Sequence, residues 1–312
     1  MQYLYTFGFR PDEEALCRLE QRAFFSRESA KGMNYLVSDV KIVPSRSPFI
    51  RERIALLLVA HSFDELLVFV ESFSVGERTY KVVCVNDEVI GPEPKIGHRK
   101  RREMEITVGS LIDGEVDLVE PEVELAIAKI GNTYYFGELE RGEAVWLSHI
   151  ERPVPYSTAL STKHARALVN ITAPELEGVR IVDPCCGVGT VVIEALSMGA
   201  NILGRDMNWF VTSGSRQNID HFGYEGVIEL GPIEAITDTF DAAIIDMPYN
   251  VFTHSSDVDK QSIIASARRI AERVVFVSSE DLREAIEAEH FTITDDCRIQ
   301  KHQFVRNVYV CH

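Results

Sequence analysis

The sequence predicts an α/β protein of two domains, an α+β region followed by a doubly wound sheet. From residue 179 onward, apolar strand-like runs alternate with helical stretches, which is typical of a parallel sheet. The last two strand-like runs are joined by a short link, which predicts an antiparallel hairpin at the sheet edge. The segment Arg152–Pro155 cannot lie inside a helix because its two prolines lack amide donors, so it reads as a linker. We therefore expect domains at 1–150 and 151–312.

The second domain opens with an expected helix over Ser161–Ile171, where Ser161 is a favourable capping residue. Further helices are expected at about 189–198, 208–221 and 257–272. The expected strands are Val179–Val182, Ile202–Gly204, Val227–Leu230, Ala242–Ile245, Val274–Val277, Phe291–Ile299 and Phe304–Val310.

The first domain mixes short strand patterns with amphipathic helical patterns and contains no internal repeat. We expect strands at Gln2–Phe7, Leu66–Phe69 and Tyr80–Val85, helices at Glu13–Phe25 and Ile50–Ala60, and further helix and strand material at Glu105–Leu118 and Glu124–Phe136.

Composition excludes several classes of protein. The chain has 312 residues, of which 46% are hydrophobic, enough to give each domain a buried core. Its longest clean apolar run, Ile54–Ala60, is far shorter than the roughly 20 residues that span a bilayer, so we expect a cytoplasmic protein. Six cysteines without a C-x-x-C pair argue against a zinc site or a disulfide framework. Adjacent Cys185 and Cys186 lie in a glycine-rich turn, where their small size explains them better than redox chemistry does.

The net charge of −16 argues against nucleic-acid binding by the surface as a whole. One dense basic run exists, at His98, Arg99, Lys100, Arg101 and Arg102. Most charge runs are solvated loops, and that interpretation stays open beside an RNA contact. Any RNA binding must therefore rest on a local basic patch, and this run is one.

The first chemical motif is D-P-C-C-G-V-G-T at 183–190, placed where a buried strand turns into a helix. In an open α/β sheet this turn is the ligand crevice. Gly187 and Gly189 allow the backbone to approach a ligand closely, and the following helix offers its amides to a carboxylate such as that of methionine. A tight turn without a ligand is the alternative, because a lone G-x-G is a weak signal.

A second acid, Asp206, ends the next strand. A carboxylate in that position can accept hydrogen bonds from both ribose hydroxyls of a nucleoside cofactor. The dinucleotide fingerprint needs a small third glycine where Val192 stands, so a nicotinamide cofactor is disfavoured.

The third motif, D-M-P-Y at 246–249, follows the apolar run Ala242–Ile245. An exocyclic amine of a nucleobase is a poor nucleophile because its lone pair is delocalised into the ring. Asp246 and the Met247 carbonyl, fixed by Pro248, can accept the amine hydrogens and orient the amine. Tyr249 can stack on an extruded base, a contact worth about 1 to 3 kcal/mol. A plain strand-end turn is the alternative, but the three motifs in order favour a functional site.

Together these motifs resemble class I methyltransferases that act on amino groups, which implies a Rossmann-like sheet and S-adenosylmethionine as methyl donor. The stretch R-P-V-P-Y-S-T-A-L-S-T-K-H-A-R-A-L-V-N-I at 152–171 resembles the THUMP-containing tRNA guanine-N2 methyltransferases that act on guanosine ten. The stretch V-D-L-V-E-P-E-V-E-L-A-I-A-K-I-G-N-T-Y-Y-F-G at 116–137 is similar to the end of a THUMP domain. In that family a ferredoxin-like subdomain precedes the THUMP domain, which binds the RNA, so the resemblance places the basic run in an RNA-binding region.

Two residues depart from the family pattern. Met247 replaces the first proline of the amine-holding motif, and Pro232 stands where an acid usually contacts adenine, a contact that Glu234 or the Ile233 backbone could replace.

The sequence thus predicts a tRNA guanine-N2 methyltransferase without a metal. Two alternatives remain open: an adenine-N6 or other nucleic-acid amine methyltransferase, and a catalytically inactive RNA-binding homologue. We assign Asp246, Met247, Pro248 and Tyr249 to catalysis, and cofactor binding to Asp183, Pro184, Cys185, Gly187, Gly189, Thr190, Asp206, Met207, Ile233 and Leu160.

Overall fold

The chain folds into two compact units that do not follow the expected division at residue 150. The computed structural model describes residues 1–85, 96–156, 159–248, 257–301 and 304–312. The first unit comprises Met1–Gly8 and Glu28–Glu143, and the second comprises Phe9–Arg27 and Ala144–His312. Two differences from the expected ranges are the boundary, which falls at Glu143 and Ala144, and the short segment Phe9–Arg27, which belongs with the C-terminal part of the chain.

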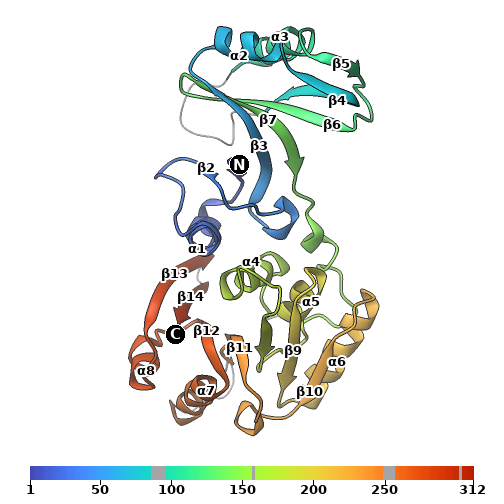
Figure 1. Ribbon diagram of the computed structural model, residues 1–312. Helices are drawn as coiled ribbons and strands as arrows, with labels where there is room; N and C mark the ends of the chain where they lie inside the picture. The colour runs from blue at the N-terminus through green and yellow to red at the C-terminus, as the bar shows by residue number, and fades with distance from the viewer. Residues whose placement is uncertain (86–95, 157–158, 249–256, 302–303) are drawn as a thin grey trace. The chain divides into compact units, whose positions relative to one another are not determined.

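The first unit is built on a mixed sheet with strand order β2-β1-β3-β7-β6-β4-β5 (Figure 1). Strand β4 runs parallel to β5 and β6, and the other neighbouring strands are antiparallel. Side chains of α2 and α3 share one buried apolar cluster with the sheet. The elements are β1 (Tyr3–Phe7), β2 (Tyr35–Ser38), η2 (Pro44–Arg46), β3 (Ile50–Ala60), α2 (Phe63–Val70), β4 (Ser74–Cys84), α3 (His98–Gly109), β5 (Asp113–Val116), β6 (Val123–Ile130) and β7 (Thr133–Arg141).

Two of our secondary-structure predictions in this unit were wrong. Ile50–Ala60 is a strand, not a helix, because it pairs along its length with β1 on one side and β7 on the other. Leu66–Phe69 lies inside helix α2, not in a strand. The missed signal was the cap: the Ser62 hydroxyl accepts a hydrogen bond from the Glu65 amide at 3.1 Å, which starts a helix through the apolar run.

The second unit contains the predicted doubly wound sheet, with strand order β10-β9-β8-β11-β12-β14-β13 (Figure 1). The first five strands in this order are parallel, and β14 and β13 form the expected antiparallel hairpin at one edge. The elements are η1 (Pro11–Glu13), α1 (Glu14–Phe25), η4 (Val145–Leu147), α4 (Thr162–Thr172), β8 (Arg180–Asp183), α5 (Thr190–Ser197), β9 (Asn201–Asp206), α6 (Trp209–His221), β10 (Val227–Leu230), η5 (Ile233–Ala235), β11 (Phe240–Asp246), α7 (Asp257–Ile270), β12 (Ala271–Ser278), α8 (Arg283–Ala288), β13 (Ile293–Lys301) and β14 (Phe304–Cys311).

The central strands of this sheet are buried on both faces. The runs Ala242–Ile245 and Val274–Val277 are almost fully inaccessible, as expected for parallel strands that helices cover on both sides. The part of the chain that the structure describes contains no helix long and apolar enough to cross a membrane.

Helix α1 belongs to the second unit because it packs on α4 and on β13 (Figure 1). Its contact with α4 is partly polar: the Asn170 amide donates to Glu20 Oε1 at 2.6 Å, and both side chains are buried. At the other contact, Arg22 forms an ion pair with Asp295 of β13 at 2.7 Å. An N-terminal helix therefore completes the C-terminal sheet unit.

Candidate active site

Three neighbouring parallel strands each end in an aspartate at one edge of the second sheet. Strand β8 ends at Asp183, β9 at Asp206 and β11 at Asp246. Because the carboxyl ends of parallel strands meet at one edge, all three side chains line a single cavity of about 650 Å³. That volume lies within the range of pockets that bind small molecules.

The glycine-rich turn after β8 forms the floor of this cavity. Gly187 and Gly189 have φ values of 52° and 84°, a left-handed backbone conformation that favours glycine. A Cβ atom on Gly189 would also lie 2.3 Å from the Ser215 hydroxyl oxygen. Helix α5 begins directly after Gly189, and its first residues Thr190 and Val191 line the cavity. The amino end of the helix, with its partial positive charge, therefore faces the ligand space.

Backbone amides hold Asp206 in place. Its Oδ2 accepts a hydrogen bond from the Gly187 amide at 3.0 Å, and its Oδ1 accepts one from the Asn208 amide at 2.9 Å. Burial raises the pKa of Asp206, and the two hydrogen bonds oppose that rise. Each carboxylate oxygen keeps one further lone pair, so this side chain can still accept from two hydroxyl groups.

The cavity wall is anionic. Asp183 is 3% exposed, and its Oδ1 accepts from the Cys185 amide at 3.2 Å. Burial first, and then the charges of Asp246 and Asp206, raise its pKa well above the usual range. A cationic ligand would relieve this repulsion, whereas an anionic ligand would add to it.

Cys185 and Cys186 remain thiols in this environment. Burial and the neighbouring carboxylates raise the pKa of both thiols well above the usual range, so the reactive thiolate form is scarce. Among the residues that the structure describes, no group of three or more His, Cys, Asp or Glu side chains is spaced to hold a metal ion.

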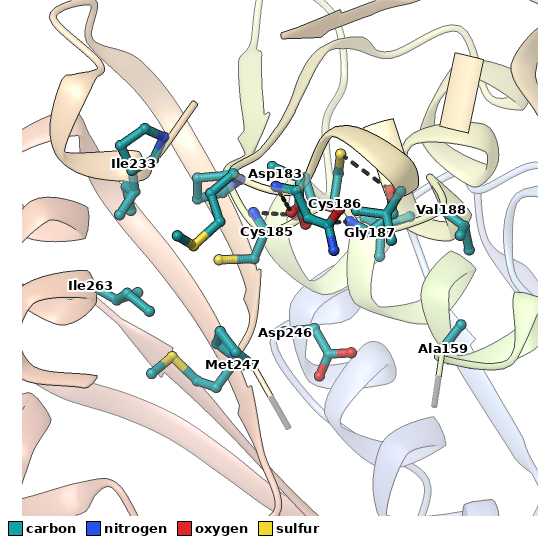
Figure 2. A pocket seen from close by; sticks show the side chains of 18 of the residues that line it. Ala159, Asp183, Cys185, Cys186, Gly187, Val188, Ile233, Asp246, Met247 and Ile263 are labelled. Atoms are coloured by element: carbon teal, nitrogen blue, oxygen red, sulfur yellow. Dashed lines mark hydrogen bonds between the residues drawn. The ribbon is translucent and has the colours of Figure 1, made fainter. Parts of the chain in front are cut away.

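The end of β11 carries two side chains with different environments. The Met247 side chain is buried, and its amide donates to the Val277 carbonyl at 2.8 Å, which continues the pairing with β12. Figure 2 shows Asp246 and Ala159 on one side of the cavity and Met247, Ile233 and Ile263 on the other. The Asp246 carboxylate therefore lies on a different side of the cavity from the apolar side chains of Met247, Ile233 and Ile263.

Pro248 is exposed at the rim of the cavity. Tyr249 lies outside the described residues.

The segment at 232–234 lines the cavity on the side away from Asp246. Ile233 is buried, and the Pro232 carbonyl accepts from Arg205 Nε at 3.1 Å. Glu234 lines the cavity, and its Oε1 accepts from the Ser262 hydroxyl at 2.6 Å. Glu234 is thus available at the cavity, although one of its oxygens already has a partner.

The cavity brings together most of the residues that the motifs singled out. Gly189 is an exception, because it lies behind the lining as the capping residue of α5. The residues from the motifs that line the cavity are Leu160, Asp183, Pro184, Cys185, Gly187, Thr190, Asp206, Met207, Ile233, Asp246, Met247 and Pro248.

Several lining residues were not singled out from the sequence. Asn208 had a readable signal: its side chain accepts from the Phe210 amide at 2.9 Å and so caps α6. The others reach the cavity from loops and from helices α5, α6 and α7, and they are Tyr156, Ala159, Val188, Val191, Val211, Lys260, Ser262 and Ile263.

The basic run lies in the first unit and begins helix α3, so it is not a loop. The Arg99 side chain is 93% exposed and pairs with Glu103 at 2.9 Å, and Arg102 pairs with Glu105 at 3.2 Å. Acidic residues one turn further along therefore offset part of the positive charge.

Residues 150–294 match the UPF0020 family of RMKL-like methyltransferase domains. Two curated relatives are tRNA (guanine(10)-N2)-dimethyltransferases. The protein of Methanothermobacter thermautotrophicus is 29% identical over 163 residues, and that of Methanocaldococcus jannaschii is 26% identical over 170 residues. Each match covers 48% of this chain and 48% of the relative, so the chain spans about half the length of the curated relatives it matches.

A solved structure extends the likeness in fold to nearly the whole chain. The protein SMU.472, provisionally described as a methyltransferase and solved in complex with SAH, is 11% identical with a TM-score of 0.50. The match covers 99% of this chain and 97% of that one, which supports the class I Rossmann-like fold.

Proposed function

We propose that this chain, with an RMKL-like methyltransferase domain at residues 150–294, methylates the N2 amine of a guanosine in tRNA with S-adenosylmethionine as donor. The observation that carries the proposal is the shared cavity of Asp206 and Asp246. We assign Asp206 to the ribose of the donor and Asp246 to the acceptor amine. Asp183 lies between them at the end of the intervening strand.

The cavity suits S-adenosylmethionine on grounds of charge and shape. When bound, this donor supplies a methyl group activated by a positively charged sulfur. The carboxylate of Asp206 supplies negative charge on the donor side of the cavity, and the amino end of α5 suits the carboxylate of the methionine part. Asp206 retains lone pairs for ribose hydroxyls, and the wall at Ile233 and Ile263 suits a flat apolar ring.

The acceptor amine is held by groups at the end of β11. The Asp246 carboxylate accepts one amine hydrogen, and the Met247 carbonyl accepts the other. This arrangement turns the nitrogen lone pair toward the donor, so that positioning supplies most of the rate. The burial of the Met247 side chain and the pairing of its amide with Val277 fix the direction of that carbonyl.

tRNA is proposed as the substrate because two curated relatives are named for tRNA guanine-N2 methylation. We propose that the first unit is a ferredoxin-like and THUMP-like RNA-binding region and that His98–Arg102 contacts phosphates. We also propose a cytoplasmic setting, on the ground of this substrate alone.

Nucleoside mass spectrometry after incubation with S-adenosylmethionine and unmodified tRNA tests the proposal. N2-methylguanosine is the expected product, with little methylation of duplex DNA. N6-methyladenosine as sole product would indicate an adenine methyltransferase. RNA binding with no methyl transfer would indicate an inactive homologue.

The amine-holding role predicts a specific loss in the variant Asp246→Asn. We expect methylation to fall at least about a hundredfold, because the amide lacks the negative charge with which the carboxylate strengthens the hydrogen bond from the amine and stabilises the positive charge that develops on it. The affinity for S-adenosylmethionine, measured by calorimetry, should change little. Full activity in this variant would refute the assigned mechanism.

A further inference from the structure

Two cations from separate segments of the chain pair with one buried carboxylate in the second unit, and a third cation, Arg306 of β14, acts on the neighbouring His164. Lys163 Nζ of α4 lies 2.6 Å from Glu13 Oε2, and Arg10 Nη2 lies 3.0 Å from Glu13 Oε1. The Glu13 side chain is only 3% exposed, so it fixes both cations without facing solvent. The cations themselves are more accessible, with side-chain exposures of 57% for Arg10 and 23% for Lys163.

A neighbouring histidine lies within reach of the same charged side chains. His164 is 8% exposed, and its Nδ1 has no hydrogen-bond partner in the described part of the chain. Burial first, and then the charges of Arg306, Lys163 and Arg10 against that of Glu13, lower its pKa to about 4. Three cations and one carboxylate therefore act on His164, and Asp12 lies further out beside Arg10 at 3.3 Å.

This group lies at the same edge of the sheet as the cavity. Leu160 lines the cavity, and Lys163 follows three residues later. The Cα atoms of these two residues are therefore at most about 11 Å apart. Arg306 is located through the register of the sheet: Asp246 of β11 pairs with Val277 of β12, and Val277 pairs with Val308 of β14. Arg306 comes two residues before Val308, and because β14 is antiparallel to β12 it lies further toward the cavity edge of the sheet than Asp246 does. Strand β14 is two strand spacings from β11, which is about 10 Å.

A polyanionic substrate needs such a feature here. The cavity is lined by three aspartates, and the chain carries a net charge of −16, so both repel a nucleic-acid backbone. A base that enters the cavity nevertheless brings its own phosphates to the rim. Cations beside the rim can hold these phosphates while the base occupies the anionic interior.

We propose that Arg10, Lys163 and Arg306 form a phosphate-binding site that holds the RNA backbone next to the nucleotide being methylated. This inference rests on the proposed function, because it takes RNA as the substrate. It gives the segment Phe9–Arg27 a role in substrate binding as well as in folding, since this segment carries Arg10 and Glu13, and Glu13 pairs with Lys163.

The test is the double variant Arg10→Gln with Arg306→Gln, which leaves the contact between Lys163 and Glu13 intact. The KM for tRNA should rise about tenfold or more, the range that charge-assisted hydrogen bonds reach. The logarithmic dependence of tRNA binding on salt should flatten by about 0.7 to 0.9 for each phosphate that the variant no longer binds. The kcat at saturating tRNA and the affinity for S-adenosylmethionine should stay unchanged.

The matched control is Arg268→Gln, which removes the same charge from the last turn of α7, at the opposite edge of the sheet. It should change neither the KM for tRNA nor the salt dependence. An unchanged salt dependence in the double variant would refute the phosphate site and leave the proposed function standing. A wild-type protein that methylates no RNA would refute the proposed function instead.

Nuclear magnetic resonance of His164 gives a second measurement that does not depend on activity. A bound phosphate adds negative charge near the imidazole, so the pKa of His164 should rise from about 4 when a short single-stranded RNA is added to the full chain. The resonance is identified by its loss in His164→Gln. A pKa that does not respond to saturating RNA would contradict the proposed site.

Discussion

Asp206 illustrates how one side chain joins the two halves of a binding site. Its two oxygens tie the glycine-rich turn after β8 to the beginning of α6 through the amides of Gly187 and Asn208. The same residue lines the cavity. The residue therefore shapes the turn and offers acceptors to a ligand, so a substitution affects both.

We expect Asp206→Asn to lower the affinity for S-adenosylmethionine by about ten to a hundredfold, the range for hydrogen bonds to a charged group. Calorimetry on the full chain measures this directly. The control is Asp238→Asn, because Asp238 is 70% exposed and precedes β11 at the edge of the sheet away from the cavity. Equal affinity for S-adenosylmethionine in the wild type and in Asp206→Asn would show that Asp206 does not hold the ribose.

The placement of site residues could be foreseen where a motif is local. Asp183, Asp206 and Asp246 each end an apolar run, and the parallel order of the strands brings such ends together. Lys260 and Ser262 could not be foreseen, because they reach the cavity only through the way α7 packs, which no short motif records.

At the scale of helices and strands, pairing with neighbouring elements determines the secondary structure of segments whose sequence pattern is ambiguous. Ile50–Ala60 reads as amphipathic in sequence, yet two flanking strands make it β3. The strands of the second sheet were easier to predict, because continuous apolar runs between turns are typical of strands buried on both faces. The packing of α1 on α4 had no sequence signal, since its contacts lie about 150 residues apart.

Helix α3 carries the clearest prediction for a single element. Replacing the exposed Arg99, Lys100 and Arg102 by glutamine should weaken tRNA binding about equally across sequences. The slope of the logarithm of the binding constant against the logarithm of the salt concentration should become shallower by about one for each phosphate that these side chains hold in the wild type. Affinity for S-adenosylmethionine should not change.

Lys31 and Lys41, exposed in the same unit, provide the matched control when replaced by glutamine. If both variants give the wild-type salt dependence, the basic run of α3 is a solvated helix face.

At the scale of the whole molecule, the chain passes between its two units three times. We expect the fragment Ala144–His312 to be far less stable than the same unit in the full chain. Burial of Leu16 and Leu19 on α1 contributes about 3 to 6 kcal/mol, a large part of the roughly 5 to 15 kcal/mol that stabilises a domain. The fragment also leaves Asn170 without Glu20.

Thermal unfolding and S-adenosylmethionine binding of the fragment test this expectation. A peptide spanning Phe9–Arg27, added to the fragment, should restore part of the thermal stability and part of the affinity for S-adenosylmethionine. A fragment as stable as the full chain would show that α1 is dispensable.

The early position of α1 also has a consequence for synthesis on the ribosome. The helix emerges well before its partners, since Ala144 and all that follows it are still to be translated. At about 5 to 20 residues per second, that delay is roughly 6 to 23 s. During this time the apolar face of Leu16, Leu19 and Phe24 has no native partner in the C-terminal unit. A nascent chain of this protein therefore exposes an apolar helix face for seconds, and the second unit can fold to completion only after the entire intervening unit has been made.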